Sequence, residues 1–238
     1  MRKVAILQSN YIPWKGYFDL IQSVDHFIFH DDIQYTKNDW RNRNKIKTPV
    51  GTQWITIPCG TNEKRLIYEV ELKDASWQKK HWNLIKNNYQ KSPFWSLYSD
   101  FFEEFYLGQE WINLSHLNQY LIKIIAEEFL GINNTLFDDS RKYNLTEKKE
   151  LRVLELLNKV GATHYISGPA AKDYIQEETF KNEDIDLSWF DYSHYPEYSQ
   201  MYGEFIHDVS ILDLLFNCGT NSYRYITKKK INALVTEV

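Results

Sequence analysis

The segment from Gln34 to Lys47 combines the residue types that bind phosphate groups and sugar hydroxyls. It carries five cations, three asparagines and two aromatic residues, and the acid pair Asp31-Asp32 lies just upstream. Arginine offers a rigid bidentate fork to a phosphate or carboxylate, and lysine supplies a mobile charge. Asparagine amides both donate to and accept from hydroxyls. The segment predicts a ligand with anionic and hydroxyl-rich or planar parts; a solvated basic β-hairpin or loop is the alternative.

Two loops that could form this site follow two neighbouring predicted strands. Lys3–Gln8 and His26–His30 read as short buried strands, and residues 16–23 between them have helical spacing. Strand, helix and strand in this order favour parallel pairing with a right-handed connection. Ligands of such sheets bind beyond the carboxyl ends of the strands. We therefore expect the loops Gln8–Trp14 and His30–Lys47 to meet at one edge of the sheet.

The remaining pattern predicts an α/β fold with a mostly parallel central sheet flanked by helices. Residues 77–131 form a largely helical insertion or subdomain within a single α/β domain, residues 1–238. The segments with strand or helix patterns are Gln53–Pro58, Ile67–Leu72, His164–Ser167 and Ile185–Tyr192 as strands, and Trp77–Gln90, Leu114–Leu130, Glu147–Val160, Ala170–Glu178 and Ser210–Phe216 as helices. Asp138–Thr146 reads as a polar linker.

Composition limits the class of protein. The chain has 238 residues, a formal net charge of −4 and no basic tail, so a dedicated polynucleotide binder is not expected. No apolar run is long enough to span a bilayer, and the amino terminus reads as a first strand, so we expect a cytoplasmic protein. Cys59 and Cys218 are far apart and are expected to be free thiols. The 8 Trp and 17 Tyr residues suit walls that are apolar yet hydrogen-bond at their edges.

Three further motifs could carry chemistry. His30-Asp31-Asp32 could supply a base with an orienting carboxylate, or form a solvated strand end; a hard-cation site would need more acids, so no metal ligands are assigned. Ser167 and Gly168 follow a predicted strand, where hydroxyl and backbone amides could bind an oxyanion, although Ser167 could equally cap a helix. His207, beside Asp208, is a candidate proton acceptor or a structural donor.

Pro13-Trp14-Lys15-Gly16-Tyr17 opens the first predicted helix, where an anion can be cradled. The place corresponds to the HIGH-type signature of nucleotidylyltransferases, but Lys15 and Tyr17 replace the histidines and no KMSKS-like segment is present. Phosphate binding without nucleotidyl transfer fits these residues better.

Taken together, the motifs resemble the WbqC-like protein family of bacteria. The matching segments are Gln8–Phe18, Asp31–Lys37 with Trp40–Arg43, Tyr165–Gly168 and Ser210–Gly219, in family order. The resemblance implies a role in O-antigen or surface-polysaccharide biosynthesis, on an amino sugar linked to a nucleotide.

The hypothesis that joins the residues to the resemblance is acyl or aminoacyl transfer to the amine of a nucleotide-linked amino sugar. The donor would be a thioester of coenzyme A or of an acyl carrier protein. Phosphates would be bound by Lys15, Lys37, Arg41 and Arg43, and hydroxyls by Asn10, Gln34 and Asn42, with Gln8 as a further substrate-binding residue. A stacking wall would be formed by Tyr11, Trp14 and Trp40. The proton would be taken by His207, or by His30 with Asp31, and Asp32 is a further catalytic candidate. The alternatives are a non-catalytic binding subunit and a nucleoside-triphosphate-dependent activating enzyme.

Overall fold

Five parallel strands form the central sheet. The computed structural model describes residues 1–173 and 175–227. The strands are β1 (Lys3–Leu7), β2 (His26–Phe29), β5 (Leu136–Asp139), β6 (His164–Ser167) and β7 (Asp186–Trp189). Their spatial order is β5-β2-β1-β6-β7, and every neighbouring pair is parallel. The predicted α/β class with a mostly parallel sheet is confirmed.

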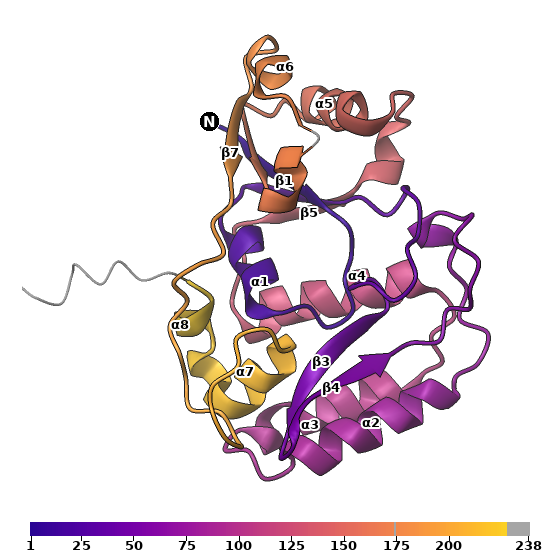
Figure 1. Ribbon diagram of the computed structural model, residues 1–238, viewed down its shortest axis with the longest axis vertical. Coiled ribbons are helices and arrows are strands. Elements are labelled where there is room, and N and C mark those ends of the chain that lie inside the picture. The colour runs from indigo at the N-terminus through magenta and orange to yellow at the C-terminus, as the bar shows by residue number, and fades with distance from the viewer. Residues whose placement is uncertain (174, 228–238) are drawn as a thin grey trace, which may run out of the picture.

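Helices cover both faces of this sheet. Helix α1 (Lys15–Gln22) connects β1 to β2, and α4 (Leu114–Ile124) leads towards β5 (Figure 1). Phe27 and Phe29 of β2 pack in one hydrophobic cluster with these two helices, whereas Ile28 packs in a second cluster with α5 (Lys149–Lys159) and α6 (Glu177–Lys181). Because both faces are covered, β2 is buried along its whole length, and its residues 27–29 form a continuous apolar run.

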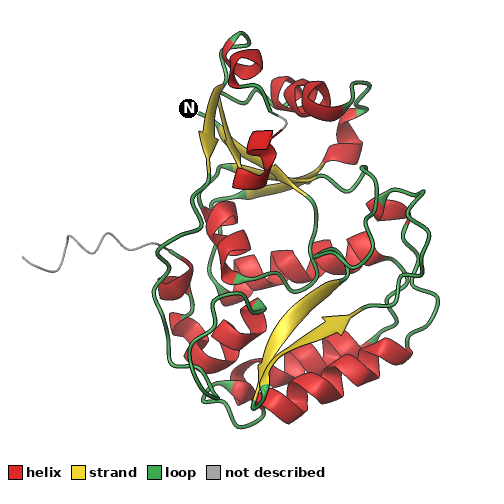
Figure 2. Cartoon of the chain, viewed as in Figure 1, coloured by secondary structure: helices red, strands yellow, loops and turns green. Residues whose placement is uncertain are grey.

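The helical region between β2 and β5 packs beneath the sheet. Its helices are α2 (Ser76–Tyr89), α3 (Trp95–Glu103) and α4, and the last two continue into single π-helical turns, Glu104–Gly108 and Ile125–Phe129. In front of α2 and α3 lies the antiparallel hairpin of β3 (Arg43–Thr48) and β4 (Gly51–Thr56) (Figure 2). The carboxyl-terminal helices α7 (Ile211–Cys218) and α8 (Tyr223–Ile226) pack against α3 and α1. The expected helical stretch in the middle of the chain is confirmed.

Three segments differ from the expectation. Ile67–Leu72 is not a strand: it begins with a short 3-10 helix, Ile67–Glu69, and its amides bond to separate segments at Ile33 and Ile112. The supposed linker begins within the edge strand β5, which pairs with β2. Residues 170–178 form a 3-10 turn and then the start of α6 rather than one helix; Tyr174 in this segment lies outside the described residues.

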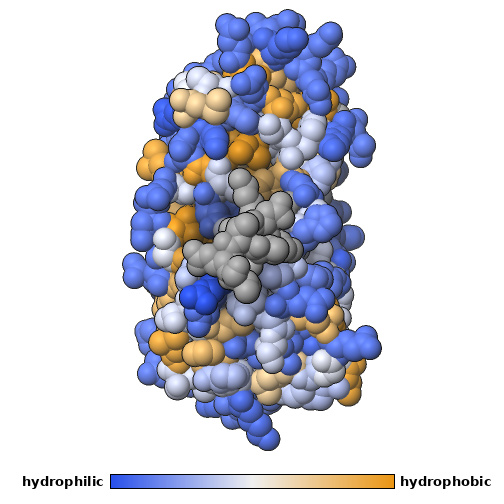
Figure 3. Space-filling view, turned by 90° about the vertical axis from the view of Figure 1, so that its left-hand side faces the viewer, coloured by the Kyte–Doolittle hydropathy of each residue, from blue (hydrophilic) through white to orange (hydrophobic). Residues whose placement is uncertain are grey.

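The surface near β7 and α8 is mainly hydrophilic. Figure 3 shows this side of the molecule, where the hydrophobic side chains that reach the surface form separate small areas. Among the described residues no helix has the length and apolar character needed to cross a membrane.

Candidate functional site

A crevice is expected between β1 and β6. From β1 the chain adds β2 and then β5 on one side of β1. After β5 it returns and adds β6 and then β7 on the other side of β1, so the direction reverses between β1 and β6. The loops that leave two adjacent strands at such a switch point diverge and leave room for a ligand. Here these are the loop that begins at Gln8 and the turn at Ser167 and Gly168.

The loop after β1 meets the segment that leads into β3. Arg41 donates from Nη1 to Asn10 Oδ1 at 3.1 Å and from Nη2 to Gln8 Oε1 at 3.2 Å. The amide of Tyr11 donates to the carbonyl oxygen of Trp40 at 2.9 Å. The two loops therefore lie side by side at the carboxyl edge, as the strand-helix-strand pattern predicts.

A cavity of about 300 Å³ opens where these loops meet. Its lining residues are Asn10, Pro13, Trp14, Trp40, Asn44 and Asp208. The Trp14 indole packs against Tyr192 and Tyr195, with ring centroids 5.5 and 5.7 Å away. A Cβ atom at Gly16 would lie 2.4 Å from the Trp14 ring, so the absence of a side chain at Gly16 makes room for this wall. The surface of the cavity is thus mostly apolar, with two indoles and with polar groups from Asn10, Asn44 and Asp208.

A second tryptophan extends the aromatic surface out of the cavity. Trp40 and Trp54 are each 41% exposed, and their ring centroids are 5.4 Å apart. The guanidinium of Arg43 lies 4.2 Å from the centre of the Trp54 ring. Among the described residues Arg43 has no carboxylate partner, and its Nε atom has no hydrogen-bond acceptor. Arg43 is therefore free to meet an anion beside an exposed π surface.

Three lysines near the cavity hold the irregular segment 192–208 in place. Lys15 is only 2% exposed, donates to the carbonyl oxygen of Pro196 at 3.0 Å and lies over the rings of Tyr195, Tyr198 and Phe205. Burial lowers the pKa of Lys15 to about 8. Lys47 donates to Gln200 Oε1 and Lys45 to Asp208 Oδ2, at 2.7 and 2.5 Å. These three lysines have internal partners. Arg41 also has internal partners, Gln8, Asn10 and Asp39, so Arg43 is the arginine beside the cavity that has no carboxylate partner among the described residues.

His207 is exposed at the end of this segment, next to the cavity residue Asp208. Its ring packs edge-on against Phe205, with centroids 4.6 Å apart. Partial burial and the charge of Lys15 lower the pKa of His207 below its usual value of 6.5. The imidazole is therefore neutral at pH 7 and able to accept a proton.

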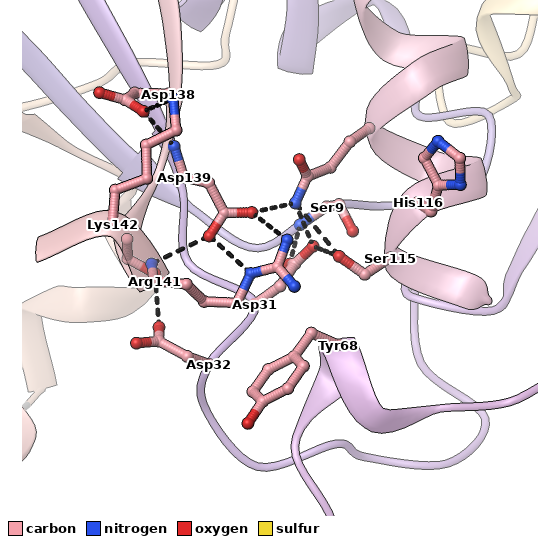
Figure 4. Close-up of polar contacts among 12 residues, drawn as sticks. Ser9, Asp31, Asp32, Tyr68, Ser115, His116, Asp138, Asp139, Arg141 and Lys142 are labelled. Atoms are coloured by element: carbon pink, nitrogen blue, oxygen red, sulfur yellow. Dashed lines mark hydrogen bonds and ion pairs between the residues drawn. The ribbon is translucent and has the colours of Figure 1, made fainter. Parts of the chain in front are cut away.

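Asp31 ties three elements together beneath the crevice. Its Oδ1 accepts from the Ser9 amide at 2.8 Å, and its Oδ2 accepts from the Ser115 hydroxyl at 2.5 Å and from Gln119 Nε2 at 3.0 Å (Figure 4). The side chain is completely buried. These contacts join the exits of β1 and β2 to α4, and they occupy both carboxylate oxygens.

Asp32 and His30 belong to a neighbouring ionic network. Asp32 is bound by Arg152 and by the Ser140 hydroxyl, and His30 Nε2 lies 3.7 Å from Asp32 Oδ1. Burial lowers the pKa of His30, and the charge of Arg152 adds to the effect, although Asp32 opposes it. A hollow of about 480 Å³ beside this network is lined by charged residues that are already paired: Asp32 pairs with Arg152, and Arg141 pairs with Asp139, which lies outside the lining.

Asp139 completes the network at the end of β5. Arg141 binds it in a bidentate manner, from Nε at 2.9 Å and from Nη2 at 2.7 Å. Burial opposes ionisation of Asp139, but hydrogen bonds from Arg141 and Gln119 outweigh it, so its pKa lies below the usual range. Among the residues that the structure describes, no group of three His, Cys, Asp or Glu side chains is arranged to hold a metal ion.

The other predicted site residues lie outside the cavity lining. Tyr11 is fully buried, and its hydroxyl bonds to His81 Nδ1 and the Tyr106 hydroxyl, so its ring belongs to the core rather than to the stacking wall. Asn42 is buried and donates to the Ile57 carbonyl. Gln34 and Lys37 are exposed on the loop before Trp40.

Ser167 and Gly168 flank the opposite side of the crevice. Ser167 is buried at the end of β6, and its carbonyl oxygen accepts from the Phe190 amide at 2.7 Å. A Cβ atom at Gly168 would lie 3.8 Å from the hydroxyl of Tyr192, the residue whose ring packs on Trp14. The turn after β6 therefore reaches the aromatic wall through Tyr192.

Six residues at or near the cavity lie outside the predicted set: Pro13, Asn44, Trp54, Tyr192, Tyr195 and Asp208. Asn44 donates to the Tyr11 and Ile12 carbonyls, at 3.1 and 2.8 Å, and so fixes the wall of the cavity. The residue types were visible in the sequence, because Asp208 adjoins His207 and Asn44 lies within the basic segment. Their convergence depends on contacts between residues far apart in the chain.

Comparison with known proteins agrees with the motifs. The family model of the WbqC-like protein family matches residues 8–225. A protein of Mycobacterium tuberculosis (strain ATCC 25618 / H37Rv), named uncharacterized protein Rv1507c, is 45% identical over 228 residues, which cover 95% of this chain and 98% of that protein. No solved structure matches the chain.

Proposed function

The chain belongs to the WbqC-like protein family, and from this membership and the geometry of the carboxyl-edge cavity we propose that it transfers an acyl or aminoacyl group. The acceptor is the amine of a nucleotide-linked amino sugar used in surface-polysaccharide (O-antigen) biosynthesis. The donor is a thioester of coenzyme A or of an acyl carrier protein.

The observation that carries the proposal is the cavity with two indoles where the loop after β1 meets the segment that leads into β3. Trp14 and Trp40 line it, and Arg41 and Arg43 lie beside it without being buried in the core. Indole rings pack against the apolar faces of sugars, and guanidinium groups bind diphosphates in a bidentate manner. A sugar inside the cavity and a diphosphate at its rim satisfy both sets of groups.

The transfer step needs one base and no covalent enzyme intermediate. The amino group first loses a proton to solvent; the neutral amine nitrogen then attacks the thioester carbonyl carbon, the C–S bond breaks, and the thiolate leaves. In the proposal His207 accepts the proton from nitrogen and passes it to the thiolate. Its lowered pKa keeps the imidazole in the accepting form at pH 7.

In this proposal Asp31, Asp32 and His30 do not transfer the proton. Both oxygens of Asp31 are occupied, and Asp32 is bound by Arg152 and Ser140. We assign these residues to positioning of the loops after β1 and β2. Positioning of the reacting groups supplies much of the acceleration in reactions of this kind.

The experiment is a reconstituted reaction with a panel of UDP- and dTDP-linked amino sugars and short acyl-coenzyme A donors. Release of free thiol and the mass of the sugar product are measured together. His207→Gln is expected to lower the rate of thiol release about 10²- to 10⁴-fold, and His194→Gln is the matched control because His194 is exposed on the same segment. Arg41→Ala and Arg43→Ala are expected to raise KM for the nucleotide sugar.

The same assay separates the two alternatives. Tight nucleotide-sugar binding with no product, and with no effect of His207→Gln, would indicate a non-catalytic binding subunit. Pyrophosphate release that depends on a nucleoside triphosphate would indicate an activating enzyme. Absence of a thermal shift with every phosphorylated ligand would contradict the proposal, because a ligand that binds the folded state raises its stability.

A further inference from the structure

The lining of the aromatic cavity contains one formal charge, the carboxylate of Asp208. We infer that Asp208, together with the indoles of Trp14 and Trp40, forms a subsite that recognises the protonated amino group of the ligand. The inference rests on the proposed function and makes it more specific, because it states which end of the ligand enters the cavity and what selects it.

The other polar groups of the lining are largely occupied by the protein. Asn44 Nδ2 donates to two backbone carbonyls, and its Oδ1 accepts from the Lys45 amide at 2.8 Å. Asn10 Oδ1 accepts from Arg41. Asp208 uses Oδ2 for Lys45, whereas Oδ1 has no donor among the described residues. The strongest acceptor left for a ligand is therefore a carboxylate oxygen.

The position of Asp208 is fixed by the backbone around it. The Ser210 amide donates to the Lys45 carbonyl at 2.8 Å, and Trp14 and Ser210 form an antiparallel bridge. The Ile211 amide donates to the Pro13 carbonyl at 2.9 Å. These contacts place Asp208 against the wall that carries Trp14, with its side chain still 61% exposed.

An ammonium group fits this environment better than a hydroxyl or a phosphate. Indole faces attract cations, most strongly among the aromatic side chains. In the existing pair the Lys45 side chain is 22% exposed, but the Asp208 side chain is 61% exposed, so water already screens the carboxylate and a ligand cation can share it. A phosphate group inside the cavity would be repelled by the Asp208 carboxylate, whereas Arg41 and Arg43 outside the cavity would attract it. The ligand is thereby oriented with its amine inwards.

The test is isothermal titration with matched UDP-hexoses that carry either an amine or a hydroxyl at carbon 2, 3 or 4, with UDP as a third ligand. For the wild-type protein at pH 7 the amine is expected to bind about tenfold more tightly than its hydroxyl partner at one of these carbons. Asp208→Asn is expected to bring this ratio close to one while UDP binds as before. Lys45→Met removes the competing cation and is expected to raise the ratio.

The outcomes separate this inference from the proposed function. If amine and hydroxyl ligands bind equally well to the wild type, or if Asp208→Asn leaves the ratio intact, the subsite is refuted while nucleotide binding still stands. If Lys45→Met weakens binding and Asp208→Asn strengthens it, the cavity recognises an anion, which also refutes the subsite. If UDP ligands do not bind, free amino-hexoses and their hexose partners are compared by tryptophan quenching. If the free amino-hexose binds more tightly than its hexose partner and Asp208→Asn removes this difference, the subsite is supported without the nucleotide. If there is no such difference, the subsite is refuted.

Discussion

The substitution Asp31→Asn tests whether Asp31 is a positioning residue. The side chain is fully buried, and three donors converge on it: the Ser9 amide from the loop after β1, and the Ser115 hydroxyl and Gln119 Nε2 from α4. Asparagine has nearly the same shape but replaces one acceptor oxygen by an NH₂ group. At least one donor then faces another donor in the absence of water.

The expected loss of stability follows from these contacts. A hydrogen bond to a charged group contributes about 1.5–3 kcal/mol, and a buried donor left without an acceptor costs about 1–3 kcal/mol. Since one or two of the three contacts are lost, Asp31→Asn should lower the free energy of unfolding by about 2–4 kcal/mol. For a chain of this size that corresponds to a fall in Tm of roughly 4–16 °C.

The assay is urea unfolding followed by tryptophan fluorescence, with differential scanning calorimetry for Tm. Asp208→Asn is the matched control, because it makes the same change of atoms at a carboxylate that is 61% exposed, and its Tm should stay close to the wild type. Ser115→Ala, which removes one donor, should cost less than Asp31→Asn. If Asp31→Asn unfolds at the wild-type urea concentration yet abolishes transfer, the positioning role is wrong and Asp31 acts in the chemical step.

Three further outcomes are expected. Gly16→Ala should displace the Trp14 indole, because the new Cβ would lie 2.4 Å from the ring, and ligand affinity measured by titration should fall. The acid limb of the pH profile of kcat/KM should lie below pH 6.5 and move upwards in Lys15→Met, because Lys15 helps to lower the pKa of His207. Between pH 8 and pH 10 the unfolding free energy of the wild type should rise relative to Lys15→Met, because the unfolded state binds the Lys15 proton more tightly than the folded state does.

Each of these outcomes has its own control. In a Trp14→Ala background, Gly16→Ala should have little further effect on affinity; an undiminished effect would mean that it does not act through the indole. His207→Gln should remove the acid limb altogether, and a limb that persists belongs to another group. Parallel stability curves for Lys15→Met and the wild type from pH 8 to pH 10 would show that the pKa of Lys15 is not lowered.

The strongest local signals in the sequence were reliable for the fold. Val4, Ala5 and Ile6 form a short apolar run, and β1 occupies it; helix α5 ends near Gly161, which has a φ of +64°. Weak or ambiguous sequence patterns gave wrong predictions where the secondary structure of a segment depends on a partner elsewhere in the chain. Leu136–Asp139 contains two acids, and it is a strand because it pairs with β2 and Phe137 stacks on Phe29. The apolar residues Ile67, Val70 and Leu72 are instead buried in the main hydrophobic cluster without forming a strand.

The sequence by itself determined the chemistry that is available and the edge of the sheet where it gathers. Strand order along the chain and the periodicity of the helices place Gln8, Asn10 and Arg41 at the same carboxyl edge, as their hydrogen bonds show. Only the tertiary structure decided which charged side chains remain available to a ligand. Lys15 and Lys47 look like ligand-binding cations in the sequence, yet carbonyl and amide oxygens of the segment 192–208 bind them, whereas Asp208 keeps one carboxylate oxygen open. A local pattern specifies which residues are charged, but whether a charge is used inside the protein depends on partners more than 150 residues away in the chain.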